Sequence, residues 1–199
     1  MVIVTKPIRR SDGGAFLREW LSDPLRVAAI VPSGRALAEI MTRDLNPASA
    51  PVIELGPGTG AFTDALIRRG IPEDRLALIE TGSNFVNLLR FRLPRATVLA
   101  MDATQLRKMT LFGGESAGAV VSGLPVLAMP PRAVMLIVHG AFVHLRPGGA
   151  MYQFTYGPVC PVKRQILDRL GLEAKRIGGA MINLPPASVY RITRIADRA

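Results

Sequence analysis

Cysteine and histidine are scarce in this sequence. The 199 residues include one cysteine, Cys160, and two histidines. A single cysteine excludes an internal disulfide, and so few cysteine and histidine side chains exclude the common zinc sites. We therefore expect no bound metal and a reducing, cytoplasmic setting.

Long apolar runs are also missing. The longest uncharged stretches, 116–131 and 133–145, are shorter than the roughly 18 to 20 residues that cross a bilayer. The chain starts with MVIVTKPIRR, where basic residues follow a very short apolar stretch, which is the wrong order for a signal peptide. We expect no membrane-spanning segment, so a protein of this kind that acts at a membrane has to lie on its surface.

Acidic residues are too few to balance the basic ones. Lys and Arg total 25 against 15 Asp and Glu, which gives a net charge of +10. This surplus indicates an anionic partner, and charge alone leaves nucleic acid, an anionic membrane surface and an acidic small molecule open. The apolar fraction of 49% predicts a globular protein, and the length suits one sizeable core.

Helices and short apolar strands alternate through most of the chain. Residues 14–45 have the spacing of two helices, and from residue 51 apolar runs such as VIEL at 52–55 alternate with helical segments. This order predicts an α/β fold with a mostly parallel, seven-stranded sheet covered by helices on both faces. A closing pair of strands indicates one antiparallel strand at the C-terminal edge. We divide the chain into an N-terminal helical segment, 1–50, and a main domain, 51–199.

A glycine-rich loop, ELGPGTG at 54–60, follows the first strand of this domain and precedes a helix. Glycine has no Cβ, so backbone there can turn tightly and approach a ligand closely. Glu80 and Asp102 end the next two predicted strands. Open α/β sheets bind ligands at the carboxyl ends of their strands, so the three strand ends predict a cofactor site.

The loop lacks the spacing of the dinucleotide-binding G-x-G-x-x-G motif. It resembles motif I of class I S-adenosylmethionine-dependent methyltransferases, E-x-G-x-G-x-G, and ALIE and MDAT resemble two further motifs of that class. The resemblance implies S-adenosyl-L-methionine as cofactor and S-adenosyl-L-homocysteine as product. It places Glu80 at the ribose and Asp102 with Ala103 at the adenine. At the methionine part it places Glu54, Gly56, Gly58 and Gly60.

The fourth strand ends in SGLP at 122–125. A neutral amine has to be oriented by acceptors so that its lone pair points at the methyl carbon. Ser122, Gly123 and Leu124 resemble the N-L-P-Y or N-P-P-Y segment of amino-methylating enzymes, although serine replaces asparagine and no aromatic residue follows Pro125. We expect these three residues to take part in catalysis, with Ser122 also next to the cofactor.

The flanking segments make the resemblance more specific. The stretch FLREWLSDPLRVAAIVPSGRALAEIM, SGLP, HLRPGG and YQFTYGP together look like the small soluble bacterial phospholipid N-methyltransferases. That family methylates phosphatidylethanolamine stepwise towards phosphatidylcholine. The resemblance implies a phospholipid substrate, an anionic membrane surface as partner, and a location at the inner face of the cell membrane, with no nucleic acid or obligate protein partner.

An amphipathic segment near the start fits a surface-bound enzyme. Its apolar side chains and nearby arginines have the pattern of an interfacial helix, in which each basic residue contributes about 1 kcal/mol near an anionic bilayer. The residues are Phe16, Leu17, Trp20, Leu21, Arg9 and Arg10. Tyr156, close to the end of the fifth predicted strand, is our candidate for stabilising the methylated head group.

Two other functions share these motifs. An RNA adenine N6-methyltransferase would use the same cofactor and would explain the positive charge, but the segment after Pro125 lacks an aromatic residue to stack a flipped base. A non-catalytic membrane-binding module could keep the pocket as a scaffold, but both Glu80 and Asp102 are present.

Overall fold

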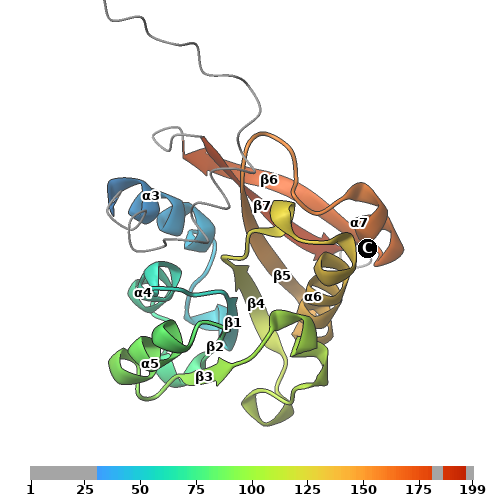
Figure 1. Cartoon of the computed structure of the whole chain (residues 1–199). Coiled ribbons are helices and arrows are strands. Elements are labelled where there is room, and N and C mark those ends of the chain that lie inside the picture. The colour runs from blue at the N-terminus through green and yellow to red at the C-terminus, as the bar shows by residue number, and fades with distance from the viewer. Residues whose placement is uncertain (1–30, 181–185, 196–199) are drawn as a thin grey trace, which may run out of the picture.

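A computed structural model describes residues 31–180 and 186–195 of the chain. The six residues predicted to bind a membrane, Arg9, Arg10, Phe16, Leu17, Trp20 and Leu21, lie outside the described residues. Figure 1 shows one layered unit built around a central sheet.

Seven strands form this sheet, in the order β3-β2-β1-β4-β5-β7-β6 (Figure 1). All neighbouring pairs from β3 to β5 are parallel, whereas β7 pairs antiparallel with both β5 and β6. Six strands therefore run one way and β7 runs the other. The strands are β1 Val52–Leu55, β2 Leu76–Glu80, β3 Thr97–Ala100, β4 Ala117–Ser122, β5 Leu145–Tyr156, β6 Leu172–Ala180 and β7 Ala187–Arg194.

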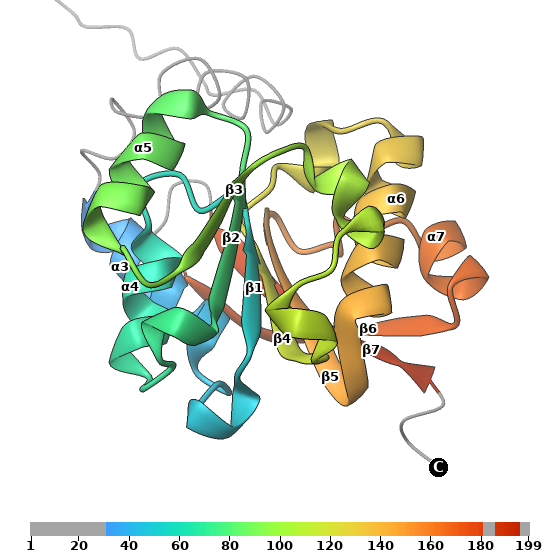
Figure 2. The same cartoon turned by 90° about the horizontal axis from the view of Figure 1, so that it is seen from below.

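Helices cover both faces of the sheet. In Figure 2, α3, α4 and α5 lie on one side of the strands, and α6 and α7 lie on the other. Their bounds are α3 Val31–Thr42, α4 Ala61–Arg68, α5 Ser83–Arg92, α6 Pro131–His144 and α7 Arg164–Arg169. Short 3-10 helices occupy Pro47–Ser49, Glu73–Arg75, Ala103–Lys108, Phe112–Gly114 and Val126–Ala128.

Two apolar layers hold the helices to the sheet. Alternate strand residues point to opposite faces, so Ile53 and Leu55 pack towards α6 and α7, whereas Val52 packs towards α3, α4 and α5. Because both faces are covered, β1 and β2 are buried along their whole length. This explains why their sequences read as continuous apolar runs rather than as alternating ones.

The predicted α/β fold is confirmed, with one difference in detail. The antiparallel strand β7 lies one position in from the edge, because β6 occupies the outermost place. The described part of the N-terminal segment, α3, packs against α4 and β6 through Leu37 and Met41. The division of the chain at residue 50 stays a prediction. In the described residues, no helix is both long and apolar enough to cross a membrane.

Candidate active site

The glycine loop leaves β1 at the carboxyl edge of the sheet. Its backbone is held beside β2, because Gly56 N donates to Ile79 O at 2.9 Å. Gly56, Gly58 and Gly60 have φ angles of 66°, 55° and 90°, a region that other residues adopt only with strain. Gly60 precedes α4, and no side chain caps that helix. The loop therefore presents backbone N–H groups and a helix N-terminus at the strand ends.

Glu80 ends β2 and ties this loop to the next one. One carboxylate oxygen, Oε2, accepts from Gly58 N at 3.0 Å, and Oε1 accepts from Thr81 N and Gly82 N, each at 2.8 Å. The residue is nearly buried, at 9% exposure. A carboxylate has about four lone-pair positions, so capacity remains for a ligand hydroxyl after these three bonds.

Asp102 follows β3, next to the end of β2. Met101 N donates to Glu80 O at 2.9 Å, which brings the two strand ends together. The Asp102 side chain is exposed and its Oδ1 accepts from Thr104 N at 2.7 Å, so it caps the following 3-10 helix. Ala103 is buried against the core. The structure thus places Glu80, Asp102 and Ala103 on adjacent loops.

Glu54 lies under the loop, inside the protein. Its Oε2 accepts from the Thr63 hydroxyl of α4 at 2.7 Å, and its Oε1 has no hydrogen-bond partner in the described structure. Burial raises the pKa of this carboxyl to about 8, and the Thr63 bond only partly opposes that. Glu54 is therefore a neutral carboxylic acid at pH 7 in the protein without a ligand. Its free oxygen is an unused acceptor next to the loop.

The SGLP turn packs directly on the glycine loop. Gly123 N donates to Leu55 O at 2.8 Å, and a Cβ on Gly123 would lie 2.6 Å from Gly56 O. A Cβ on Gly56 would in turn lie 2.8 Å from the Leu124 side chain. We expected Gly56, in the glycine loop, to let backbone approach a ligand. The structure shows that Gly56 and Gly123 first of all let two loops approach each other.

Ser122, the last residue of β4, lies beside Gln153 of β5. Ser122 is buried, and its Oγ accepts from Leu124 N over 3.4 Å. Gln153 is also buried; its Nε2 donates to Leu124 O at 3.0 Å and to Phe154 O at 2.9 Å. A flipped amide would place oxygen against two carbonyl oxygens, so the bonding fixes its orientation. Gln153 Oε1 has no partner in the described structure.

Sequence reasoning missed Gln153. We singled out the segment QFTYGP for its resemblance but gave the glutamine no role. A signal was present, because Gln153 is a polar residue in the middle of an apolar strand, and buried polar groups in that setting need hydrogen-bond partners.

Tyr156 borders a narrow notch at the end of β5. The notch, about 20 Å³, is bounded by the SGLP turn, Phe154, Thr155 and Tyr156. Tyr156 and Phe62 each pack edge-on against Phe154, with ring centroids 5.6 and 6.0 Å away. Burial raises the pKa of Tyr156, which keeps its phenol protonated at neutral pH. The notch holds no more than a water-sized group, so a larger ligand has to approach from outside it.

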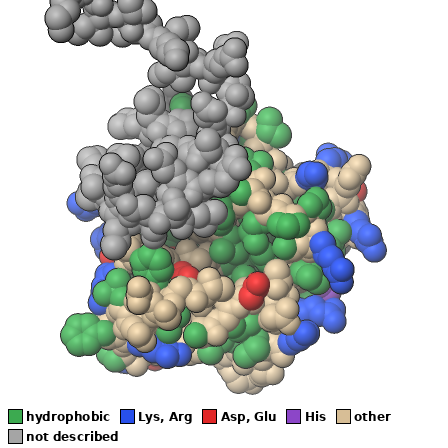
Figure 3. All heavy atoms as spheres, viewed as in Figure 1, with side chains coloured by type: hydrophobic (Ala, Val, Ile, Leu, Met, Phe, Trp, Pro, Cys, Tyr) green, Lys and Arg blue, Asp and Glu red, His purple; other side chains and the backbone are tan. Residues whose placement is uncertain are grey.

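Apolar side chains surround this edge. Figure 3 shows them gathered at the centre of the face seen in Figure 1, with Lys and Arg towards the rim. Leu127 and Val159, in the loops after β4 and β5, are 58% and 73% exposed. In the described part of the chain, no group of three His, Cys, Asp or Glu side chains is arranged to hold a metal.

The sequence of this chain is similar to that of a lipid-modifying enzyme. No family model matches. The chain is 29% identical over 180 residues to an ornithine lipid N-methyltransferase from Singulisphaera acidiphila. The match covers 88% of this chain and 92% of that protein. This bears out the likeness to lipid N-methyltransferases that the motifs indicated.

Solved structures show the same architecture. A magnesium protoporphyrin IX methyltransferase from Synechocystis, solved with bound S-adenosylmethionine, matches with a TM-score of 0.65 and 13% identity, over 94% of this chain and all of that one. A TehB-like S-adenosylmethionine-dependent methyltransferase from Corynebacterium glutamicum matches with a TM-score of 0.63 and 14% identity, over 90% and 99% of the two chains. The chain therefore has the fold of the class I S-adenosylmethionine-dependent methyltransferases.

Proposed function

We propose that this protein is an S-adenosylmethionine-dependent N-methyltransferase that acts on the primary amine of a membrane lipid. The observation that carries the proposal is the likeness over 180 residues to a lipid N-methyltransferase. The polar side chains Glu80 and Asp102 at the strand ends support it. Phosphatidylethanolamine is the acceptor that we expect from the sequence motifs. Ornithine lipid, which the relative's name states, is the second amine lipid to test.

The residues at the strand ends fit the cofactor. When bound, it supplies an activated methyl group on a sulfonium, which becomes a thioether as the N–C bond forms and the S–C bond breaks. Glu80, already oriented by three backbone N–H groups, has remaining acceptor capacity for the ribose hydroxyls. We assign Asp102 and Ala103, on the loop next to Glu80, to the adenine. Glu54 Oε1, which has no partner in the described structure, can accept a hydrogen bond from the cationic methionine part of the cofactor.

The acceptor side is built by β4 and β5. Leu124 O already accepts from Val126 N and from Gln153 Nε2. The Ser122 hydroxyl and Gln153 Oε1, which has no partner in the described structure, are therefore the groups that can accept the amine N–H groups. These acceptors orient the amine lone pair and leave its excess proton to solvent. Tyr156, kept neutral by burial, offers its ring and hydroxyl to the head group. The chain's own contribution is thus positioning and the exclusion of water.

Lipid access is supported by the exposed apolar side chains at this edge. Leu127 and Val159 flank the ends of β4 and β5, where the head group has to enter. Exposed apolar residues next to a site favour contact with a bilayer surface. Membrane attachment at the inner face of the cell membrane, with residues 9–21 as the principal anchor, remains part of this proposal.

Transfer of labelled methyl groups tests the proposal. Labelled S-adenosylmethionine is supplied with vesicles of phosphatidylethanolamine, vesicles of ornithine lipid, or structured RNA. Label in mono-, di- or trimethylated lipid supports the proposal and identifies the acceptor. Label in RNA alone would replace it by a nucleic-acid methyltransferase. Cofactor binding by calorimetry with no transfer to any amine lipid would refute lipid methylation.

A further inference from the structure

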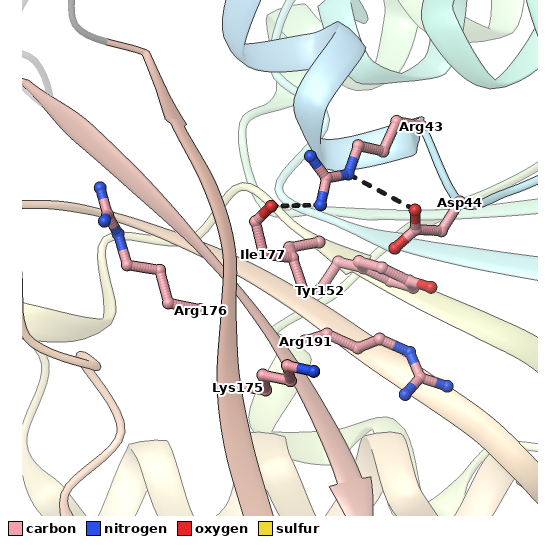
Figure 4. Close-up of a pocket in the computed structure, with 7 residues that line it drawn as sticks. All are labelled: Arg43, Asp44, Tyr152, Lys175, Arg176, Ile177 and Arg191. Carbon is pink, nitrogen blue, oxygen red and sulfur yellow. Dashed lines mark hydrogen bonds and ion pairs between the residues drawn. The ribbon is translucent and has the colours of Figure 1, made fainter.

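A second hollow lies on the face of the sheet that α3 covers. It has a volume of about 530 Å³, which falls within the size range of small-molecule sites. Its lining comes from the turn after α3 and from β5, β6 and β7, and consists of Arg43, Asp44, Tyr152, Lys175, Arg176, Ile177 and Arg191 (Figure 4). Tyr152 precedes Tyr156 by four residues, about 13 Å along the strand, so this hollow is separate from the candidate active site.

Two cations of the hollow lie directly opposite each other. Lys175 of β6 is the register partner of Arg191 of β7, which is in turn the register partner of Tyr152 of β5. The three side chains therefore share one face of the sheet. Neither Lys175 nor Arg191 forms an ion pair with any residue that the structure describes. Like charges directly across a strand pair are unfavourable.

The other charged side chains of the hollow have hydrogen-bond or ion-pair partners. Arg43 forms an ion pair with Asp44, with Nε and Oδ1 3.4 Å apart, and it also donates to the Ile177 carbonyl. Arg176 extends away from the rest (Figure 4), and its Nε donates to the Ser188 hydroxyl at 3.2 Å. Among the described residues, Lys175 and Arg191 are therefore the cations that face the hollow without an acidic partner.

Tyr152 adds a hydrogen-bond donor. Its ring is buried and its hydroxyl lies in the hollow, among Arg43, Asp44 and Arg191 (Figure 4). Burial raises the pKa of this phenol more than the neighbouring Arg191 lowers it, so the hydroxyl keeps its proton. An ammonium, a guanidinium and a phenol thus line one hollow from three adjacent strands, and all three are donors.

We infer that this hollow is a binding site for a phosphate group, held by Lys175, Arg191 and the Tyr152 hydroxyl. A phosphate oxygen accepts from each of these donors, and its negative charge removes the repulsion between the two cations. The guanidinium of Arg191 can bind two phosphate oxygens at once. The same chemistry suits a phosphorylated small molecule and the phosphate of a lipid head group. The inference does not depend on methyl transfer.

The test compares two double variants of the full chain. Lys175→Gln with Arg191→Gln removes the proposed ligands. Lys163→Gln with Arg169→Gln removes the same charge from exposed positions at α7, on the other face of the sheet. Binding is measured by calorimetry with inorganic phosphate and with glycerol 3-phosphate. Vesicles with and without phosphatidylglycerol form a separate arm, scored by co-sedimentation.

We expect the first double variant to bind the soluble phosphates at least tenfold more weakly than the wild type, and the control to bind them within twofold. A matching loss on phosphatidylglycerol vesicles would identify lipid head groups as the source, and loss confined to the soluble probes would identify free phosphates. An equal loss in both double variants would mean that only net charge matters. That result, or no binding of any probe by the wild type, would overturn the inference.

Discussion

Glu54→Gln should make the protein more stable at neutral and alkaline pH. The glutamine keeps the size of the side chain and an oxygen that accepts from the Thr63 hydroxyl, but it never ionises. The wild-type carboxyl is fully buried, and its pKa rises from 4.5 to about 8 because ionisation there costs desolvation. The variant removes this cost.

Proton linkage gives the sign and the size of this difference in the free energy of unfolding. Below pH 4.5 the carboxyl is protonated in both the folded and the unfolded chain, so it makes no difference to stability. Between pH 4.5 and 8 only the unfolded chain ionises, and the wild type loses stability as the pH rises. At about 1.4 kcal/mol per pH unit, the loss is about 3 kcal/mol at pH 7 and levels off near 5 kcal/mol above pH 8.

Urea unfolding followed by circular dichroism, repeated from pH 5 to 9, measures this difference. We expect the free energy of unfolding of Glu54→Gln to exceed that of the wild type by an amount that grows with pH. Asp74→Asn, at an exposed position of a 3-10 helix, is the matched control and should give a curve parallel to the wild type. Parallel curves for Glu54→Gln as well would show that Glu54 is ionised in the folded protein, and the reasoning would fail.

Three further changes probe the strand ends, and a fourth, in α3, is a control. Glu80→Gln should weaken S-adenosylmethionine binding at least tenfold by calorimetry, since it replaces a carboxylate that can accept ribose hydroxyls; unchanged affinity would contradict the pocket assignment. Gly123→Ala should destabilise the fold by about 1–3 kcal/mol, because its Cβ would lie 2.6 Å from a backbone oxygen of the glycine loop. Gly34→Ala, in α3 with open space around it, should instead stabilise by about 0.5–1 kcal/mol in the same unfolding assay. Gln153→Leu should lower kcat at least tenfold while cofactor affinity stays within twofold, because it removes the Oε1 atom proposed to orient the amine; a loss of cofactor affinity alone would assign Gln153 to the other half of the site.

Local sequence patterns predicted the elements of the fold well. The apolar run 52–55 and the glycines after it require a buried strand and a tight turn, and the structure has both. The position of β7 between β5 and β6 could not be read in the same way. It depends on which strand edges are left unpaired once the sheet assembles, and the sequence around 187–194 says only that a strand is there.

The site was predictable where one segment carries the whole signal. Glu80 and Asp102 stand at the ends of their own strands, so their place follows from chain order. The packing of Gly56 on Gly123 was not predictable, because it joins residues 67 positions apart. No local sequence pattern predicts the hollow lined by Lys175 and Arg191, since these two residues meet only through the register of two strands.

The insertion of β7 also determines how the sheet can open. Among the strands that the structure describes, β6 is paired with β7 alone, whereas β7 is paired on both sides. Opening β7 therefore frees the backbone amides of β6 as well, but β6 can detach while β7 stays paired with β5. Hydrogen exchange should accordingly be ordered from the rim inwards, with the amides of β6 exchanging no more slowly than those of β7.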